Sequence, residues 1–264
     1  MPLLELDAVT KTFTKRSGLL GRSVEQVEAV KEVSLAVERG EILGLVGESG
    51  CGKSTLSRCV MQLLPVTSGR IVLEGQELTA LSQWQVRPLR LNFQMVFQDP
   101  YASLNPRMTI FSTLAEAVRQ RHPRAQESDL EKRIGKLMET VGLSAKALRK
   151  YPHEFSGGQR QRIAIARALA PEPRLIIADE PVSALDVSIQ SQILNLLKRL
   201  NREFDLTMIF ISHDLSVVHY LADRIAVMQL GQIVEEGDAE AVFQSPQHDY
   251  TRTLLSAIPL LSPN

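Results

Sequence analysis

Short, almost wholly apolar runs recur along this 264-residue chain and alternate with segments of helical spacing. The first run, at residues 42–46, has the length and composition typical of a strand that is buried on both faces. Three later runs share this character, at residues 175–178, 208–211 and 225–228. Residues 188–200 place apolar positions at helical spacing, which predicts an amphipathic helix. Buried strands separated by helices indicate an α/β fold with a mainly parallel sheet and helices on both faces.

Two other parts of the chain and its end show different patterns. Apolar and polar residues alternate at 4–7 and 33–37, which predicts half-buried strands, and the basic, glycine-containing stretch at 15–23 is expected to be a loop or hairpin tip. Between 99 and 149 a helical spacing of apolar residues predicts a mostly helical lobe inserted between two sheet segments. The residues that carry this spacing are Leu130, Ile134, Leu137, Met138 and Val141. The end, 256–264, contains two prolines and is expected to be frayed.

Composition narrows the class of protein without indicating an activity. The 30 Lys and Arg residues balance 30 Asp and Glu residues, and this zero net charge disfavours a broad electrostatic contact with nucleic acid. Cys51 and Cys59 are too few for a disulfide framework or a zinc cluster. No apolar run approaches the ~20 residues of a membrane-spanning helix, and the N-terminus lacks the basic and then apolar order of a signal peptide. We therefore expect a soluble protein of a reducing, cytoplasmic compartment.

A phosphate-binding loop follows the first buried run. Its residues fit the pattern G-x-x-x-x-G-K-[ST] and are, in order, Gly47, Glu48, Ser49, Gly50, Cys51, Gly52, Lys53 and Ser54. The glycines allow backbone N–H groups to turn inward around phosphates, and the helix expected from Thr55 onward adds the positive end of its dipole. We expect Lys53 to reach the outer phosphates and the Ser54 hydroxyl to bind Mg²⁺. The alternative, a glycine-rich turn that binds nothing, is disfavoured by the flanking strand and helix patterns.

Two adjacent carboxylates, Asp179 and Glu180, end the buried run at 175–178. Successive residues of a strand point to opposite faces, so we expect the two acids to have separate tasks. We assign Asp179 to Mg²⁺, through water, and Glu180 to polarising the attacking water. By itself such a pair is more often two solvated acids, and it gains significance from the phosphate-binding loop in the same chain.

A second anion-binding device is expected at Ser156-Gly157-Gly158-Gln159, before the helical pattern of residues 160–169. Ser156 is a candidate N-cap, and the two glycines leave backbone N–H groups open at the start of the helix. On a separate helical lobe, this segment cannot easily serve the phosphates that the first loop binds. We therefore expect it to cap the γ-phosphate of a nucleotide that is bound by another subunit.

With these motifs the chain resembles the ATP-binding-cassette (ABC) ATPases over nearly its whole length. Residues 156–159 resemble the signature motif that separates this family from other phosphate-loop ATPases. The resemblance implies that Gln98 senses Mg²⁺ and couples to a transmembrane partner. It also implies that Asp186, which ends the motif Ser183-Ala184-Leu185-Asp186, lies in a loop crossing a dimer interface. His213 matches the switch histidine that contacts the γ-phosphate, and Phe13 matches the aromatic residue that stacks on adenine, where the family often has Tyr.

Each of these residues, taken singly, also has an ordinary interpretation. An isolated Gln98 is more often a surface residue, and an isolated His213 is more often a capping or core residue. An isolated Phe13 usually belongs to the core, and Asp186 also fits a simple turn. Finding all six motifs in the order of the family makes coincidence negligible.

The resemblance also implies a fold and a mode of action. The ABC ATPase version of the phosphate-loop NTPase fold combines a mainly parallel sheet with an N-terminal antiparallel β subdomain and an inserted helical subdomain. We assign residues 1–98 and 170–240 to the core, 99–169 to the helical subdomain and 241–264 to a C-terminal tail. Two such subunits sandwich two ATP molecules head to tail, each with Mg²⁺. Because all the motif residues are present, we expect a competent ATPase rather than a regulatory nucleotide-binding module.

Within the family, residues 97–106, 179–192 and 245–255 resemble the ATPases of dipeptide, oligopeptide and nickel importers. This implies the ATPase subunit of a bacterial importer, peripheral to the cytoplasmic face of the inner membrane. Its implied partners are a second ATPase subunit, two transmembrane permeases and an extracytoplasmic solute-binding protein. Peptides, nickel chelates, metallophores and glutathione are all compatible cargoes. Many relatives continue into a cysteine-containing extension that is sometimes linked with an iron–sulfur cluster, and we expect no cluster here.

The rival from another class is an ABC ATPase that moves no solute and acts in DNA repair or on the ribosome. Such proteins typically carry long coiled coils or two cassettes in one chain. This sequence has neither feature, and its neutral charge provides no footprint for a phosphate backbone. The sequence therefore favours an importer with no nucleic-acid partner.

Overall fold

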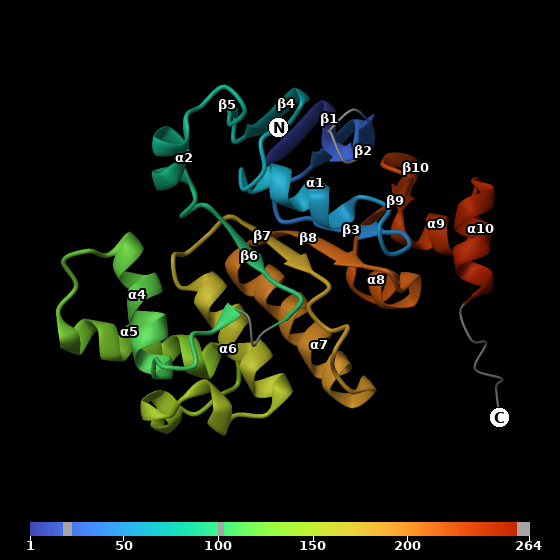
Figure 1. The fold of residues 1–264 in the computed structure, drawn as a ribbon. Coiled ribbons are helices and arrows are strands. Elements are labelled where there is room, and N and C mark those ends of the chain that lie inside the picture. The colour runs from blue at the N-terminus through green and yellow to red at the C-terminus, as the bar shows by residue number, and fades with distance from the viewer. Residues whose placement is uncertain (18–22, 100–102, 258–264) are drawn as a thin grey trace, which may run out of the picture. The chain divides into compact units, whose positions relative to one another are not determined.

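The computed structural model of the chain describes residues 1–17, 23–99 and 103–257 (Figure 1). The chain divides into two compact units, Met1–Val86 with Ile209–Asn264 and Arg87–Met208. The centre of the expected N-terminal loop, residues 100–102 of the importer-like motif and most of the expected frayed tail lie outside the described residues. None of the helices in the described ranges is both long and apolar enough to cross a bilayer.

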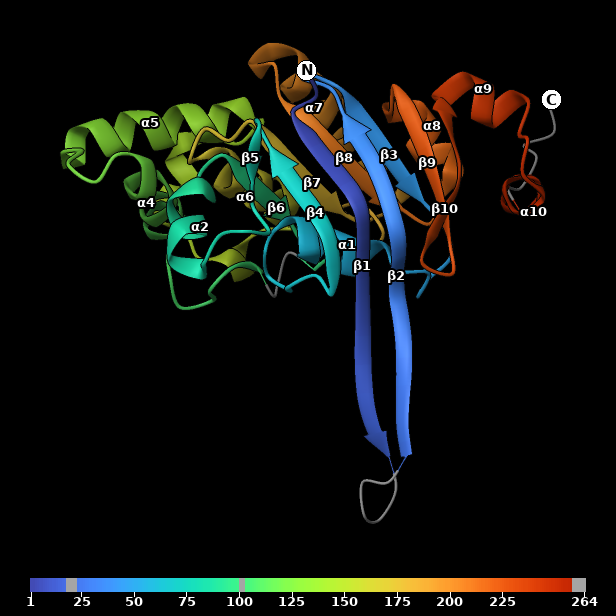
Figure 2. The same ribbon diagram turned by 90° about the horizontal axis from the view of Figure 1, so that it is seen from above.

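The first unit contains an antiparallel sheet whose strand order is β2-β1-β4-β5. These strands are β1 (Leu4–Ser17), β2 (Ser23–Val37), β4 (Ser68–Leu73) and β5 (Gln76–Glu77). Strand β1 pairs with β4 only as far as Thr10, and then continues with β2 as a long two-stranded ribbon (Figure 2). The strands therefore extend into the stretch expected to be a loop. An isolated two-stranded ribbon does not need to bury either face, so it does not impose the apolar alternation by which strands are recognised in sequence.

The second sheet region of this unit has the order β10-β9-β3-β8. Its strands are β3 (Ile42–Val46), β8 (Thr207–Ser212), β9 (Arg224–Gln229) and β10 (Gln232–Asp238), and β8 begins in the second unit, at Thr207. Strands β3 and β9 are parallel, whereas β10 is antiparallel to β9. The predicted buried run at 42–46 is indeed buried at every residue. The helices of this unit are α1 (Lys53–Val60), α8 (Leu215–Leu221), α9 (Ala239–Gln244) and α10 (Asp249–Ser256).

The second unit combines two parallel strands with a group of helices. Strand β6 (Phe93–Val96) pairs with β7 (Leu175–Asp179), and both run in the same direction. The helices are α4 (Ile110–Arg121), α5 (Glu127–Thr140), the 3₁₀ turns η1 (Ala145–Arg149) and η2 (Pro152–Glu154), α6 (Gly157–Leu169) and α7 (Val187–Phe204). Helix α2 (Gln83–Leu89) spans the boundary between the units. The expected α/β class, with parallel strands, an N-terminal antiparallel sheet and a helical insertion, is confirmed.

Candidate functional site

The phosphate-binding loop connects β3 to α1 in the first unit, and its glycines are required by close packing. Gly47 and Gly52 have positive φ angles of 157° and 114°. A Cβ atom on Gly47 would lie 2.1 Å from the carbonyl oxygen of Met228 in β9. A Cβ atom on Gly52 would lie 2.2 Å from the carbonyl oxygen of Ala29 in β2. The loop therefore runs against the backbone of two strands, which no side chain could allow.

The side chain of Lys53 is folded back into this loop. Only 4% of the residue is exposed, and its Nζ donates to the carbonyl oxygens of Gly47 at 2.6 Å and Glu48 at 2.8 Å. A weaker contact joins Nζ to the Cys51 Sγ at 3.7 Å. A positive charge at the start of a helix, inside a glycine-rich loop, is suited to phosphate oxygens.

Residues from the C-terminal part of the chain fasten the same loop. The Gly231 N–H donates to the carbonyl oxygen of Cys51 at 2.9 Å, and the Glu48 N–H donates to the Tyr250 hydroxyl oxygen at 3.0 Å. Sequence reasoning assigned no role to either partner. The only signal for Tyr250 was its place in the importer-like stretch 245–255.

The two other predicted site residues of the first unit are exposed. His213 follows the end of β8 and stands before α8, whose first turn is capped by the Asp214 side chain through the N–H of Ser216 at 2.8 Å. Phe13 lies on the β1–β2 ribbon, where it pairs with Val27 and has the Lys11 Nζ 5.2 Å from its ring centre. Val27 is two residues from Ala29, which contacts the phosphate loop, so Phe13 is on the part of the ribbon next to that loop.

In the second unit, the predicted acids occupy the end of β7. Asp179 is buried, whereas Glu180 is partly exposed and has a φ of 47°, in the left-handed region. This conformation costs a non-glycine residue about 1–2 kcal/mol. Glu180 Oε2 accepts a hydrogen bond of 3.0 Å from the Gln98 side-chain amide. The structure thus brings together two residues that sequence analysis assigned to different motifs.

The predicted signature segment forms a capped helix start. The Gln159 N–H donates to the Ser156 hydroxyl at 3.3 Å, and the Ser156 N–H donates to the Gln159 side-chain oxygen at 3.0 Å. This reciprocal pair is a capping box. A Cβ atom on Gly158 would lie 2.5 Å from the Ile189 Cγ2 of α7, so this glycine allows the first turns of the two helices to pack closely. Asp186 is the residue that precedes α7, and it is exposed.

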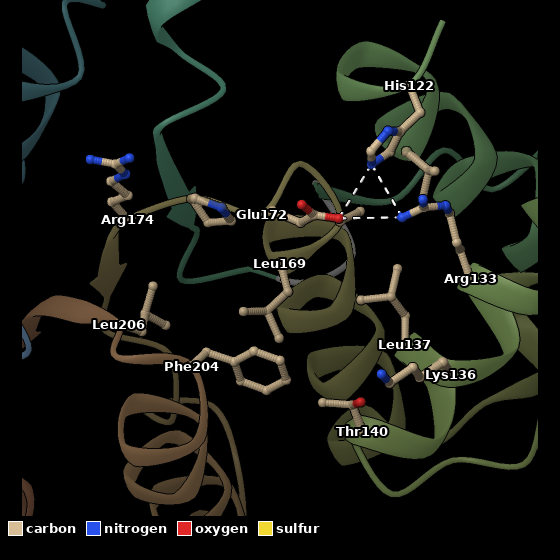
Figure 3. Close-up of a pocket in the computed structure, with 13 residues that line it drawn as sticks. His122, Arg133, Lys136, Leu137, Thr140, Leu169, Glu172, Arg174, Phe204 and Leu206 are labelled. Atoms are coloured by element: carbon tan, nitrogen blue, oxygen red, sulfur yellow. Dashed lines mark hydrogen bonds and ion pairs between the residues drawn. The ribbon is translucent and has the colours of Figure 1, made fainter. Parts of the chain in front are cut away.

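A separate cavity of about 460 Å³ lies in the second unit, between helices and the beginnings of strands (Figure 3). On one side Glu172 Oε1 is paired with His122 at 3.2 Å and Arg133 at 3.5 Å. The cavity is also lined by Arg174 and Leu206, the residues immediately before β7 and β8. Ligands of parallel sheets bind at the carboxyl ends of strands, where Asp179 and Glu180 lie. We therefore do not assign this cavity to the nucleotide.

Comparison with protein-family models identifies two matches. The model described as "ABC transporter" matches residues 30–183. The model described as "Oligopeptide/dipeptide transporter, C-terminal region" matches residues 234–264, which include Tyr250.

Curated proteins and solved structures show the same likeness. The chain is 50% identical, over its full length, to the glutathione import ATP-binding protein GsiA of Pectobacterium atrosepticum, and spans 42% of that protein. It is 51% identical over 98% of its length to the oligopeptide transport ATP-binding protein AppF of Bacillus subtilis, and spans 78% of it. The dimeric ATP-binding cassette MJ0796, in a post-hydrolysis state with ADP and phosphate, matches with a TM-score of 0.78 and 30% identity. That match covers 89% of this chain and 98% of the cassette.

Proposed function

The chain belongs to the ABC transporter family, and from this premise we propose that it is the ATP-binding and ATP-hydrolysing subunit of an importer for peptides or a related solute. The observation that carries the proposal is the arrangement of Lys53, which is buried inside the glycine loop with two carbonyl oxygens as its acceptors. Phosphate oxygens of ATP are stronger acceptors for an ammonium group than carbonyl oxygens are. In this proposal they replace the carbonyls, while Phe13 stacks on the adenine. The loop residues from Gly47 to Thr55 supply the remaining contacts.

Magnesium is the proposed companion of the nucleotide, and the donor set fits it. Ser54, Gln98 and Asp179 offer a hydroxyl, an amide and a carboxylate oxygen, which are the hard ligands that Mg²⁺ prefers. Within the ranges that the structure describes, His, Cys, Asp and Glu form no cluster of three or more that could hold a metal. A small number of protein ligands is usual for Mg²⁺ bound with substrate phosphates. When bound, the ion would neutralise charge on the phosphate oxygens.

Hydrolysis is assigned to Glu180, with His213 contacting the γ-phosphate. A general base must be held within reach of a water molecule, and the Gln98 amide holds one oxygen of the Glu180 carboxylate at 3.0 Å. In this proposal the carboxylate accepts the proton of the attacking water. The left-handed backbone of Glu180 turns its side chain away from the regular alternation of β7.

A second cassette is the proposed partner for the signature segment. Ser156, Gln159 and Asp186 are exposed in the second unit, and Val187, which begins α7 beside them, is 78% exposed. The N–H groups and the positive dipole end at the start of a helix attract an anion. The proposed dimer binds ATP between the loop of one subunit and the Ser156 segment of the other. The solved relative MJ0796 is itself a dimer with ADP and phosphate.

The transport system that this dimer would energise is proposed from the names of the relatives. GsiA is named for glutathione import and AppF for oligopeptide transport, so we propose glutathione or short peptides as cargo. The proposed partners are two permeases and an extracytoplasmic solute-binding protein. The proposed place of action is the cytoplasmic face of the bacterial inner membrane.

The test is to co-express the chain with its neighbouring gene products and to purify it from detergent-solubilised membranes. We expect it to co-purify with two permeases and a second ATPase. We expect its Mg²⁺-dependent ATP hydrolysis to rise when the solute-binding protein is loaded with glutathione or an oligopeptide. If the chain hydrolyses ATP but never associates with membrane proteins, the proposed importer role is overturned. If no assembly of the chain hydrolyses ATP, the proposed ATPase activity is overturned.

A further inference from the structure

The side chain of Tyr250, near the end of the described chain, reaches the phosphate-binding loop near its beginning. Its hydroxyl oxygen accepts the N–H of Glu48 at 3.0 Å, although the two residues are 202 positions apart. Tyr250 belongs to α10 and is only 8% exposed. Burial raises its pKa, so the phenol stays neutral at physiological pH. The contact is therefore a neutral hydrogen bond between the C-terminal helix and the loop.

This hydrogen bond acts on the same peptide unit that holds Lys53. The Glu48 N–H and the Gly47 carbonyl belong to one trans peptide, whose N–H and C=O point in opposite directions. The Gly47 oxygen accepts from the Lys53 Nζ at 2.6 Å. Tyr250 on one side and Lys53 on the other thus define the rotation of a single peptide plane. Rotation of that plane would move the acceptor of the ammonium group.

Helix α10 is itself held in place by a carboxylate of β10. Glu235 accepts the N–H of Gln247 at 2.7 Å and the N–H of His248 at 3.0 Å. These N–H groups belong to the segment immediately before α10. The Gly231 N–H, at the turn before β10, also binds the Cys51 carbonyl oxygen in the phosphate loop. Tyr250 in α10 and Gly231 before β10 therefore each donate or accept a hydrogen bond with the phosphate loop. These bonds hold the loop at two points, Glu48 and Cys51.

We propose that Tyr250 is a positioning residue, which orients the peptide between Gly47 and Glu48 and so keeps the phosphate loop ready for nucleotide. The inference rests on the proposed ATP-binding function. It gives the segment matched by the importer C-terminal model, residues 234–264, a physical task within this chain, namely to brace the loop. Tyr250 makes no contact with the nucleotide in this account and acts through the backbone.

The experiment compares the wild-type complex with Tyr250→Phe, which removes one oxygen and keeps the ring in the core. Loss of one hydrogen bond that prepares the loop should raise the KM for Mg²⁺-ATP about threefold to tenfold and leave kcat within about twofold. Tyr220→Phe is the matched control, because it makes the same change on an exposed tyrosine of the same unit. We expect this control to leave both constants unchanged.

Hydrogen–deuterium exchange provides a readout that does not depend on catalysis. In nucleotide-free protein, the peptide covering residues 44–50 should exchange faster in Tyr250→Phe than in wild type. A KM and an exchange rate that both stay unchanged would overturn the inference. A general destabilisation that lowers kcat while KM stays constant would also overturn it.

The two proposals fail in different ways. If the wild-type complex neither binds nor hydrolyses ATP, the proposed function fails. The exchange experiment then still decides the brace: faster exchange at residues 44–50 in Tyr250→Phe supports it, and equal exchange overturns it.

Discussion

The side-chain amide of Gln98 donates a hydrogen bond of 3.0 Å to a carboxylate oxygen of Glu180, across 82 positions of sequence. The two residues meet because β6 and β7 are parallel neighbours, with Val96 aligned to Ala178, and each side chain follows the carboxyl end of its strand. The amide fixes one oxygen of the carboxylate. A movement of the Gln98 side chain would therefore change the orientation of the Glu180 carboxylate, to which we assign the role of general base.

Glu180→Gln should slow ATP hydrolysis by two to four orders of magnitude while leaving ATP binding nearly intact. The change keeps the shape of the side chain and removes the oxygen that accepts the proton of water, a function worth typically 10²–10⁴-fold in rate. Steady-state hydrolysis and equilibrium ATP binding by the assembled complex measure the two effects separately.

Glu172→Gln is the matched control for this change. Its carboxylate precedes β7, at the opposite end of that strand, and its side chain is 63% exposed. We expect normal hydrolysis from it. Equal activity of Glu180→Gln and wild type would show that another group is the base.

Gln98→Ala should lower kcat about tenfold, with a smaller change in KM. The substitution frees the Glu180 carboxylate from its hydrogen bond, so that the base samples orientations that do not reach the water. A double-mutant cycle with Glu180→Gln tests the contact directly. Because Gln98 is also a proposed Mg²⁺ ligand, the rates are compared at saturating Mg²⁺. Fully additive effects of the two changes would contradict the coupling.

The strands and the phosphate loop, which depend on local sequence patterns, could be predicted from the sequence. The buried runs became β3, β7, β8 and β9 because strands covered on both faces must be apolar throughout. The glycines of the phosphate loop were recognised from spacing alone. The contacts of Gln98 with Glu180 and of Tyr250 with Glu48 were not predicted, because they join segments 82 and 202 residues apart that no periodicity links. The left-handed φ of Glu180 likewise depends on tertiary surroundings, since its sequence context is an ordinary strand end.

Gly47→Ala should prevent ATP binding and lower the melting temperature by several degrees. The new Cβ would stand 2.1 Å from the backbone oxygen of Met228, and a backbone atom of a paired strand cannot move aside as a flexible side chain can. Calorimetric titration with Mg²⁺-ATP and thermal unfolding measure the two effects.

Gly75→Ala separates steric conflict from backbone strain. Gly75 also has a positive φ, 78°, but no described atom lies within 4 Å of its Cβ position. We expect it to cost only about 1–2 kcal/mol of stability through strain, with ATP binding retained. A Gly47→Ala protein that binds ATP as wild type does would contradict the close packing of the loop.

The attachment of α10 should depend on pH through Glu235. Burial opposes ionisation of this carboxyl, but the N–H of Gln247, the Thr251 hydroxyl and the N–H of His248 together outweigh it and lower the pKa of Glu235 below its ordinary value. A lowered folded-state pKa means that the stabilisation is complete above the unfolded-state pKa and is lost as pH falls through the folded-state value.

At pH 7, Glu235→Gln should therefore melt roughly 2–4 °C below wild type, a shift that corresponds to about 1 kcal/mol. The gap should close as the pH falls through the lowered folded-state value, because the wild-type carboxyl then carries a proton too. Thermal unfolding of both proteins between pH 7 and pH 3 makes the comparison, with the exposed Glu131→Gln as the control that should show no gap. A gap that stays constant over this range would mean that the charge of Glu235 does not hold the C-terminal helix.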